Sequence, residues 1–384
     1  MSDTSNNPLS QLRQKLRRNP VLKFMSSIKI TVLCIFLLFV LTLWGTIAQV
    51  DTGLYLAQKK YFYSWFFLLF NFLPFPGAQL VLWVLFLNLV SVAITRLVYK
   101  ISHLGILIIH FGLLLYFVGA FVIFNVCVES NMTLLNGETS NVSSAYHDWE
   151  ISVWEDTKSD KRIVKAIDAS NISIGDRLPL LSMAVKAYYP NSQAFSGKPI
   201  DDKWPTINSS GITYLEAAAY SKEPEKNTPG IILDVPQAAQ KHAYILLFAG
   251  DPKPTSLKID DQTYNFQLRQ KRYQLPFSIT LKKFDKEFHP NTEIAKKYQS
   301  LVELDHDGVS REILIFMNNP LRFQDYALYQ ASYSVDQMGR ERSTLAVVKN
   351  AGRMLPYVAS LLTFAGMVVH FLVMALIKER TKNA

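Results

Sequence analysis

ISHLGILIIHFGLLLYFVGAFVIFNVCV, residues 101–128, carries no acidic or basic side chain except His103 and His110. A bilayer is crossed by about 20 apolar residues in a helix, so this stretch predicts a transmembrane helix. An ionisable side chain inside such a helix is costly and is usually kept for a function. His110, which lies deeper in the stretch than His103, is therefore the first candidate functional residue.

The composition predicts a membrane protein with one large water-exposed domain. Of 384 residues, 49% are hydrophobic and only 18% are charged, whereas soluble domains carry about 25% charged residues. The apolar residues gather near the two ends, around a polar middle at 129–353. The net charge is +9, but the basic residues are dispersed and flank apolar spans, which argues against a nucleic-acid partner. Cys34 and Cys127 form no CxxC, so neither thiol–disulfide exchange nor a zinc site is indicated.

Four transmembrane helices are expected. Their predicted bounds are Ile30–Ala48, Ala78–Thr95, His103–Phe124 and Leu355–Ile377. The uncharged stretch from Tyr61 to Thr95 is too long for one helix, and its first part, residues 61–75, is rich in Phe, Tyr and Trp. Such residues favour the membrane interface, so we expect an interfacial aromatic segment there. The first apolar stretch is too long for a cleavable signal peptide.

The basic residues predict the orientation. They precede the first span (Arg13, Lys15, Arg17, Arg18, Lys23, Lys29), join the second and third (Arg96, Lys100) and follow the fourth (Lys378, Arg380, Lys382). Four spans put all three groups on one side, which the positive-inside rule makes cytoplasmic. The expected organisation is a cytoplasmic tail at 1–29, helices 1–3 at 30–128, a domain at 129–353, helix 4 at 354–377 and a tail at 378–384. The domain, inserted between helices 3 and 4, would lie in the periplasm of a bacterial inner membrane.

The outer domain is expected to be rich in β-structure. Strand-like runs of aromatic and β-branched residues, separated by turn formers, occur at 150–154, 183–189, 264–268, 277–281, 313–317, 326–333 and 344–348. A short helix is expected near 237–242. The external histidines His147, His242, His289 and His306 are interpreted as solvated surface residues.

Glycines and histidines of the third span occupy different faces. Gly105, Gly112 and Gly119 recur every seven residues and share one face. Small residues let another helix approach closely, so this face predicts a helix–helix contact. His103 and His110 are also seven residues apart and lie roughly 160° from the glycines. The histidines are therefore expected to face a different neighbour.

The chemistry of His110 is open at this point. Neutral imidazole is a good ligand for iron and other transition metals, but a buried histidine can also relay protons or simply donate to a neighbouring carbonyl. His370 lies at a similar depth in the fourth span, so the two histidines could clamp one metal or haem iron, or be separated by other helices. His103, at the boundary, could be hydrated.

Several motifs together resemble the ResB/CcsB family of System II cytochrome c biogenesis. They are LWGTIAQ (43–49), NLVSVAITRL (88–97), HFGLLLYFVGAF (110–121) leading into VESNMTLLNGE (128–138), MNNPLRFQDYALYQASY (317–333) and AGRMLPYVASLLTFAGMVVHF (351–371). One departure is Glu129-Ser-Asn, taken as the external turn, where the family has a Glu-Gly pair. In the strongest motif, the family-like residues are Asn318, Pro320, Arg322, Tyr329, Gln330 and Tyr333. They would form either a strand–turn–strand that docks the domain on the membrane or a direct contact with the substrate.

The resemblance implies haem handling for cytochrome c maturation. It makes His110 a ligand to the iron of a transiently bound haem b, with the second axial ligand on a CcsA-type membrane partner. His370, His103, Arg96 and Lys100 are further haem-binding candidates, the two cations as partners for the propionates. Phe111, Tyr116 and Phe117 would help line an apolar slot.

The implied product is haem joined by thioether bonds to the CxxCH thiols of apocytochrome c, a second partner, with thiol-reducing proteins as possible further ones. The chain has no Trp-Trp-Asp cluster, which the resemblance assigns to the CcsA-type partner, so it would be a non-autonomous subunit of a cytochrome c synthase. Two alternatives stay open: a b-type haem electron-transfer subunit that uses His110 and His370, and a non-haem assembly scaffold whose β-domain binds partners.

Overall fold

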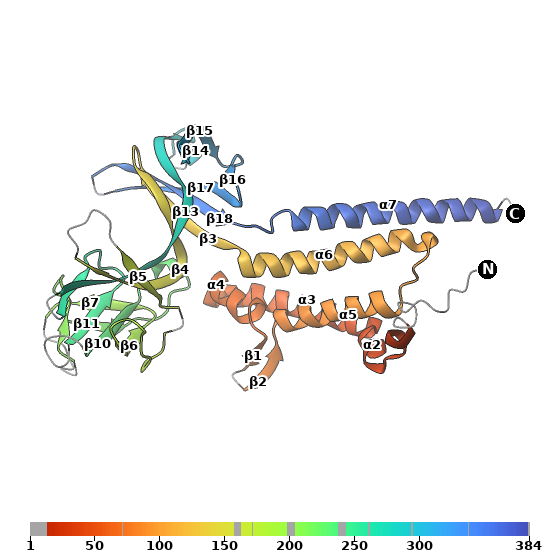
Figure 1. Cartoon of the computed structure of the whole chain (residues 1–384), viewed down its shortest axis with the longest axis horizontal. Coiled ribbons are helices and arrows are strands. Elements are labelled where there is room, and N and C mark those ends of the chain that lie inside the picture. The colour runs from red at the N-terminus through yellow and green to blue at the C-terminus, as the bar shows by residue number, and fades with distance from the viewer. Residues whose placement is uncertain are drawn as a thin grey trace. The chain divides into compact units, whose positions relative to one another are not determined.

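The computed structural model describes residues 14–70, 72–156, 163–170, 172–197, 204–236, 243–259, 262–292, 295–336 and 338–382, with side chains up to Ile377. The chain forms two compact units. We call Met1–Cys127 together with Asn350–Ala384 the membrane unit, and Val128–Lys349 the β domain. Figure 1 shows the helices of the first and the strands of the second.

The membrane unit is mostly helical. Its elements are α2 (Pro20–Met25), α3 (Ile28–Thr52), α4 (Leu54–Ala57), the π-helix η2 (Gln58–Phe62), strands β1 (Phe66–Leu69) and β2 (Leu73–Pro76), α5 (Ala78–Thr95), the 3₁₀-helix η3 (Ile101–His103), α6 (Leu104–Val126) and α7 (Leu355–Lys382). In the described part of the chain, four helices are long and apolar enough to cross a bilayer: Ile28–Thr52, Ala78–Thr95, Ile101–Val126 and Leu355–Ile377. The prediction of four such helices is confirmed. The first is longer than predicted at both ends.

A short helix occupies part of the expected N-terminal tail. The side chain of Asn19 caps α2 by accepting from the amides of Val21 and Leu22. The chain then breaks before α3, and the side chain of Asn88, 2% exposed on α5, donates to the carbonyls of Met25 and Ser27 there. A buried amide in an apolar helix is tolerated when it is fully paired. Asn88 thus fixes the α2–α3 junction against α5.

The aromatic segment 61–75 is partly a β-hairpin, which the sequence reasoning did not predict. β1 and β2 pair antiparallel, with Phe67 opposite Phe75. Phe67 is 9% exposed and packs edge-on against the ring of Tyr61, 4.9 Å away between centroids. One face of the hairpin is thereby anchored on the helices, and Figure 1 shows strands β1 and β2 extending away from them.

Glycines bring α6 and α7 into backbone contact, as predicted. A Cβ added at Gly105 would overlap the backbone of His370, and one at Gly112 would overlap the side chain of Thr363. At Gly119 it would lie 3.0 Å from the Cβ of Leu355. All three glycines are buried. The glycine face of α6 is therefore fully used by α7.

The β domain contains one large sheet and two smaller ones. Its strands are β3 (Val128–Leu135), β4 (Thr139–Glu155), β5 (Val164–Asp168), β6 (Ala184–Tyr189), β7 (Ser192–Phe195), β8 (Thr206–Ile207), β9 (Tyr214–Ala217), β10 (Gly230–Val235), β11 (Ala243–Phe248), β12 (Thr255–Ile259), β13 (Gln262–Phe288), β14 (Ala295–His306), β15 (Val309–Phe316), β16 (Leu321–Phe323), β17 (Tyr326–Val335) and β18 (Glu341–Lys349), with a 3₁₀-helix η4 (Pro224–Lys226). The large sheet runs β15-β14-β13-β4-β3-β18-β17-β16, with β12 and β5 beside it. A second sheet runs β6-β10-β11-β8, and β7 pairs with β9.

Two apolar clusters stabilise this domain. One is built around Leu281, Leu328 and Leu345, and the other around Leu233 and Phe266. β13 contributes side chains to both clusters. Side chains on alternate positions of these strands point inward, which is why a half-buried strand carries apolar residues with a period of two.

All seven predicted strand runs fall within or overlap strands, but their boundaries differ. Residues 264–268 and 277–281 were expected to be separate strands, because Pro276 lacks the amide that a ladder needs. They belong to the single strand β13. The register of β13 against β4 shifts between Gln274 and Ile279. Pro276 lies within this irregularity and therefore does not need to donate a hydrogen bond to β4. The helix expected at 237–242 lies outside the described residues.

The external turn also differs from its expected position. Glu129-Ser-Asn is part of strand β3. The chain turns after β3, where Gly137 has φ +82° and the side chain of Glu138 accepts from the amide of Leu135 (2.8 Å). The family-like residues Gly137 and Glu138 thus form the turn itself.

Candidate functional site around His110

His110 lies six residues into α6, about 9 Å from its start at a rise of 1.5 Å per residue. Its Nδ1 is 2.9 Å from the carbonyl oxygen of Ile106, one turn earlier. A carbonyl oxygen only accepts, so Nδ1 must carry the proton of this bond. In a neutral imidazole the other nitrogen, Nε2, then keeps its lone pair. Metal-ligating histidines are commonly held in this way, with one nitrogen donating to a carbonyl.

The side chain of His110 belongs to the face of α6 that meets α5. At about 100° per residue, His110 is about 140° from Gly105 and about 160° from Gly112. It is within about 20° of Phe117, seven residues later. The ring of Phe117 lies 5.7 Å from that of Phe86 on α5, centroid to centroid. The face of α6 opposite the glycines is therefore turned toward α5.

Four aromatic rings extend this face toward the Val126 end of α6. In addition to Phe86 and Phe117, Trp83 lies 5.7 Å from Phe121 and 5.8 Å from Phe86. We call Trp83, Phe86, Phe117 and Phe121 the aromatic wall. Sequence reasoning missed Trp83 and Phe86. Their three-residue spacing on α5 could have indicated a shared helix face, because residues three or four apart are neighbours on a helix. Phe117 and Phe121 on α6 have the matching four-residue spacing.

The structure does not bring His370 and His110 to one face. The backbone of His370 lies against Gly105, on the α7 side of α6. The ring of His370 neighbours that of Phe371, 5.7 Å away. His103 precedes α6 in η3, half-buried, with its Nδ1 3.0 Å from the hydroxyl of Ser102. His110 shares its face of α6 with Phe117 of the aromatic wall, whereas His370 packs on the opposite, glycine face.

The two candidate cations lie in the segment between α5 and α6. Arg96 is exposed and donates from Nε to the hydroxyl of Ser26 (3.3 Å). Lys100 is exposed and caps η3 through its backbone. In the same region Arg17 donates to the carbonyl of Leu97 (2.9 Å). Arg96 thus has a local structural role, and its remaining guanidinium donors stay accessible.

The predicted slot residues separate into two groups. Phe117 is part of the aromatic wall. Tyr116 is instead hydrogen bonded to the hydroxyl of Ser360 on α7. Phe111 is 59% exposed. Only Phe117 among the three is therefore positioned on the face that His110 occupies.

In the β domain, the MNNPLRFQDYALYQASY motif forms a strand–turn–strand, β16 and β17. Gln330 is buried at a register shift of β17. Its Oε1 accepts from the hydroxyl of Ser300 (2.6 Å), and its Nε2 donates to that of Ser343 (3.0 Å). The amide therefore links β14, β17 and β18.

The other family-like residues of the motif surround this network. Tyr333 packs against Phe284 and Tyr298, at 5.6 and 5.5 Å between centroids. Arg322 and Tyr329 are exposed. Asn318 and Pro320 lie in the segment between β15 and β16, beside Asn319, whose amide donates to the carbonyl of Leu314 (3.0 Å). The strand–turn–strand is present, and its docking on the membrane or contact with the substrate stays a prediction.

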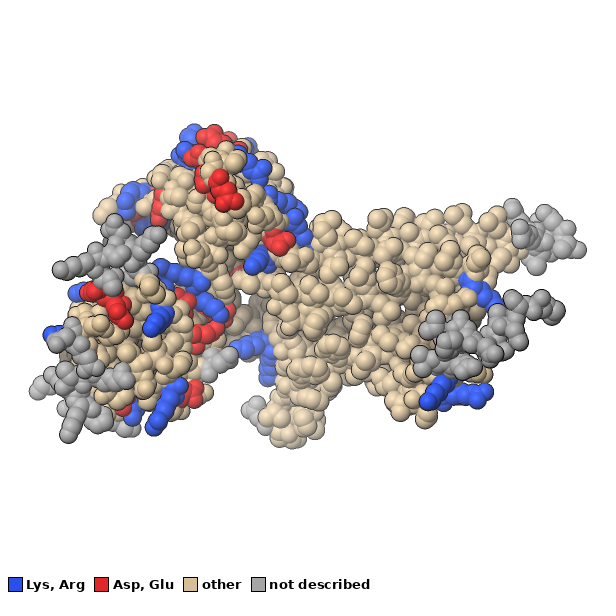
Figure 2. Space-filling view, in the orientation of Figure 1, with Lys and Arg blue, Asp and Glu red and all other residues tan. Residues whose placement is uncertain are grey.

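Several charged residues of the β domain form ion pairs. Arg269 and Glu150 form a nearly buried ion pair at 2.9 Å. Burial alone would raise the pKa of Asp168, but hydrogen bonds from Lys271 and Ser170 lower it to about 2. Figure 2 shows that charged side chains gather over the β domain, whereas most of the visible surface of the helices carries none.

No other described cluster offers a metal site. The described residues contain no group of three or more His, Cys, Asp or Glu side chains placed to hold a metal ion. His147 lies 4.0 Å from Glu225, and His306 bonds the carbonyl of Pro276 (3.0 Å). His289 is exposed, and His242 lies outside the described residues.

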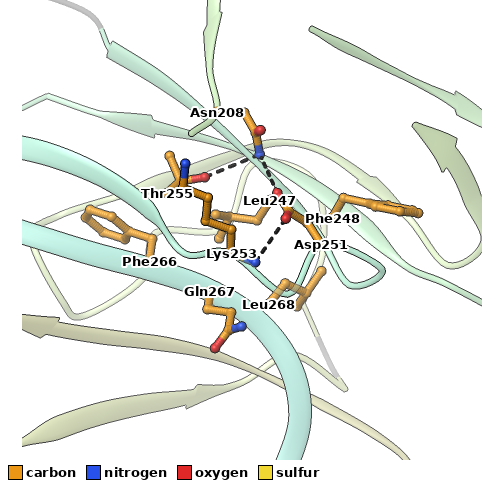
Figure 3. A pocket seen from close by; sticks show the side chains of 9 residues that line it. All are labelled: Asn208, Leu247, Phe248, Asp251, Lys253, Thr255, Phe266, Gln267 and Leu268. Carbon is orange, nitrogen blue, oxygen red and sulfur yellow. Dashed lines mark hydrogen bonds between the residues drawn. The ribbon is translucent and has the colours of Figure 1, made fainter. Parts of the chain in front are cut away.

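A polar junction of the β domain resembles a pocket but has no room for a ligand. Figure 3 shows Asn208 between Asp251 and Thr255. Its amide nitrogen is 3.3 Å from the carboxylate of Asp251 and 3.3 Å from the hydroxyl of Thr255. The space among these residues is too small to hold a water molecule. The contacts tie the segment after β8 to Asp251 and to the start of β12.

Comparison with known proteins supports the resemblance seen in the motifs. Residues 240–342 match the ResB-like family. A segment of 119 residues is 30% identical to Protein NrfI of Wolinella succinogenes; it covers 30% of this chain and 13% of NrfI. The ResB/CcsB resemblance is thereby confirmed. The family match lies within the β domain, from the start of β11 to the start of β18, and includes the motif that carries Gln330.

Proposed function

We propose that this ResB-like chain is the subunit of a cytochrome c maturation system that receives haem in the membrane through His110. Haem is here the cargo, passed outward for attachment to apocytochrome c together with a CcsA-type membrane protein. The family match supports the role in cytochrome c biogenesis. The single observation that carries the haem assignment is the 2.9 Å contact of His110 Nδ1 with the carbonyl oxygen of Ile106. Because a carbonyl only accepts, this contact assigns the proton to Nδ1 and leaves the lone pair of Nε2 for iron.

The residues around His110 suit a flat apolar ring with one central metal. His110 supplies an imidazole nitrogen, and the aromatic wall supplies apolar faces beside it. Phe117 shares the face of His110, and Phe86 stands opposite it on α5. Since aromatic side chains pack well against planar apolar groups, this wall would orient the ring and exclude water from one side.

A second axial ligand would come from the partner. His370 lies on the α7 side of α6, and His103 precedes α6 in η3, so neither is seen to share a site with His110 among the described residues. Axial ligation tunes the reduction potential of haem iron. Arg96 and Lys100, in the α5–α6 segment, would meet the propionates of haem at the membrane surface. This arrangement explains why the subunit would need a partner to complete its function.

The orientation follows from the same helices. The basic residues Arg17, Lys23, Lys29, Arg96 and Lys100 all lie at the end of the membrane unit where α3 begins and α5 ends. The positive-inside rule makes this end cytoplasmic, in a bacterial inner membrane. His110 is then near the cytoplasmic side, and the β domain is periplasmic, where it would contact the apocytochrome or shield haem.

The proposal is tested by spectroscopy of the chain co-purified with its CcsA-type partner. We expect a Soret band in the wild-type complex and its loss in His110→Gly, with recovery when imidazole is added. His370→Gly is the matched control, because the backbone of His370 lies against Gly105, on the opposite face of α6. This control should keep the band. The yield of c-type cytochromes is measured in the same strains.

Three outcomes would contradict the proposal. A complex whose His110→Gly variant keeps its Soret band and its cytochrome yield does not use this imidazole. Loss of the band in His370→Gly, with normal folding, would favour the b-type electron-transfer subunit. A folded wild-type complex without any Soret band would favour the non-haem scaffold.

A further inference from the structure

The β1–β2 hairpin of the membrane unit has an exposed apolar surface with no role in the proposed haem site. Its tip carries Phe70 and Phe72, which are 71% and 74% exposed. Phe66 and Leu68 on β1 are 61% and 52% exposed. From Tyr61 to Thr95 the sequence contains no charged residue. An exposed apolar patch of this kind marks a contact with lipid or with another protein.

The contacts of the hairpin fix its depth along α3. The ring of Phe70 lies 6.4 Å from that of Trp44, which is eight residues before the end of α3 at Thr52. Eight residues of helix span about 12 Å. α3 has 25 residues and is therefore about 37 Å long, some 7 Å more than a hydrocarbon core of about 30 Å. With α3 centred in the bilayer, the tip lies about 8 Å inside the hydrocarbon region.

Strand edges are normally excluded from that region, because an unpaired backbone amide has no partner there. The register shows how this hairpin reduces the problem. Gly77 donates to the carbonyl of Trp65 (2.8 Å), and Phe66 is opposite Pro76, Leu68 opposite Pro74. In an antiparallel pair, hydrogen-bonded positions alternate with positions whose backbone groups point outward. Pro74 and Pro76 therefore occupy the outward positions of β2.

Proline has no amide hydrogen, so the outer edge of β2 presents no unpaired N–H between Leu73 and Pro76. Proline at an edge strand also prevents pairing with another strand. A protein partner that paired with this edge would need those two donors, whereas acyl chains need none. The missing donors, the exposed phenylalanines and the absence of charge all favour lipid as the neighbour.

We propose that the β1–β2 hairpin is embedded in the bilayer, with the Pro74–Pro76 edge and the Phe70–Phe72 tip in contact with lipid acyl chains. The leaflet is the one at the Thr52 end of α3. The hairpin would act as a lateral anchor that fixes the tilt and rotation of α3 and α5 in the membrane. This inference does not depend on haem binding.

The test is spin labelling of the full-length chain, with its partner, in phospholipid nanodiscs. Cys34 and Cys127 are replaced by alanine, and a nitroxide is attached at Phe72→Cys. Relaxation by O₂, which concentrates in lipid, is compared with relaxation by the water-soluble complex Ni(II)-EDDA. We expect several-fold stronger relaxation by O₂ at this site.

Two labelled positions calibrate the measurement. Phe36→Cys on α3, where the native residue is 59% exposed, serves as the lipid control. Val309→Cys in the β domain, where it is 70% exposed, serves as the water control. Leu68→Cys replaces Phe72→Cys where the latter variant does not fold. Strong relaxation by Ni(II)-EDDA would place the hairpin in water, and weak relaxation by both reagents would show that protein covers it; either result overturns the proposal.

Discussion

Gln330 of the β domain and His110 of the membrane unit both belong to family-like motifs, but their hydrogen bonding differs. In the β domain, both ends of the Gln330 amide are hydrogen bonded, to the hydroxyls of Ser300 and Ser343. In the membrane unit, His110 uses Nδ1 for the carbonyl of Ile106, and no hydrogen bond of Nε2 is found among the described residues. A polar group whose bonds are all made within the fold stabilises the fold. One whose second bonding position is unfilled, like His110, is a candidate for ligand contact.

The difference matters for how motifs are interpreted. Gln330 and Tyr333 lie in the region that matches the ResB-like family, yet both are explained by packing within the β domain. Asn88 of the membrane unit is likewise saturated, by Met25, Ser27 and Thr31. Family resemblance alone does not separate structural from ligand-binding residues. The hydrogen bonds that each polar side chain makes within the fold do separate them.

The largest effect is expected on the glycine face of α6. In Gly112→Val, the added atoms would overlap the side chain of Thr363 and approach its backbone nitrogen. Over-packing of a tight contact costs about 1–3 kcal/mol and more where backbone must move. We expect the thermal stability of the detergent-solubilised protein to fall strongly, as measured by size-exclusion chromatography after heating. Leu113→Val, on an exposed position of the same helix, is the control; equal stability of both variants would contradict close α6–α7 packing.

A smaller effect is expected for Gln330→Leu. The substitution leaves the buried hydroxyls of Ser300 and Ser343 bonded only to each other. Each lost partner of a buried polar group costs about 1–3 kcal/mol. The midpoint of denaturant unfolding should drop, while the folded fraction keeps its haem spectrum. Tyr329→Ala changes the preceding, exposed residue and should leave the midpoint unchanged; loss of haem without loss of stability in Gln330→Leu would instead assign this residue to the ligand.

The smallest effect is expected on the stability of the folded protein at acid pH, through the side chain of Asp168. Its pKa is lowered from 3.8 to about 2, so its ion pair with Lys271 stabilises the folded protein fully above about pH 4. This contribution is lost as the pH falls from about 4 to 2. Both side chains are partly exposed, at 47% and 33%, so the effect should be below about 1 kcal/mol. Asp168→Asn should flatten this part of the pH–stability curve, measured by thermal unfolding; an unchanged curve would contradict the pair.

The apolar helices could be predicted from sequence because a bilayer demands long uninterrupted apolar runs. The glycine face of α6 was likewise readable from its seven-residue period, and α7 covers it. The β1–β2 hairpin was not predicted, because prolines at 74 and 76 argue against strands by ordinary rules. Only the pairing register shows that both prolines lie where no amide is needed.

In the candidate site, the sequence indicated that His110 and the glycines occupy different faces. It did not indicate which helix His110 faces, since α5 and α7 are both apolar. The contacts of Phe117 with Phe86 and of Phe121 with Trp83 identify α5. Tyr116 was expected beside the slot, but its hydroxyl is bonded to Ser360 on α7. Tertiary contacts of this kind are absent from a single sequence.

Strand β13 has a consequence for synthesis of the chain. The cluster that includes Phe266 is complete when residue 268 has left the ribosome, whereas the cluster that includes Leu281 needs Leu345 and Val347 as well. The first half of β13 can therefore pack early. Phe277, Ile279 and Leu281 stay exposed to solvent until nearly seventy further residues have been synthesised. At a translation rate of about 5–20 residues per second, that wait lasts several seconds. A nascent chain of this protein would be most vulnerable to aggregation and proteases during that interval, which makes it a natural client for a chaperone.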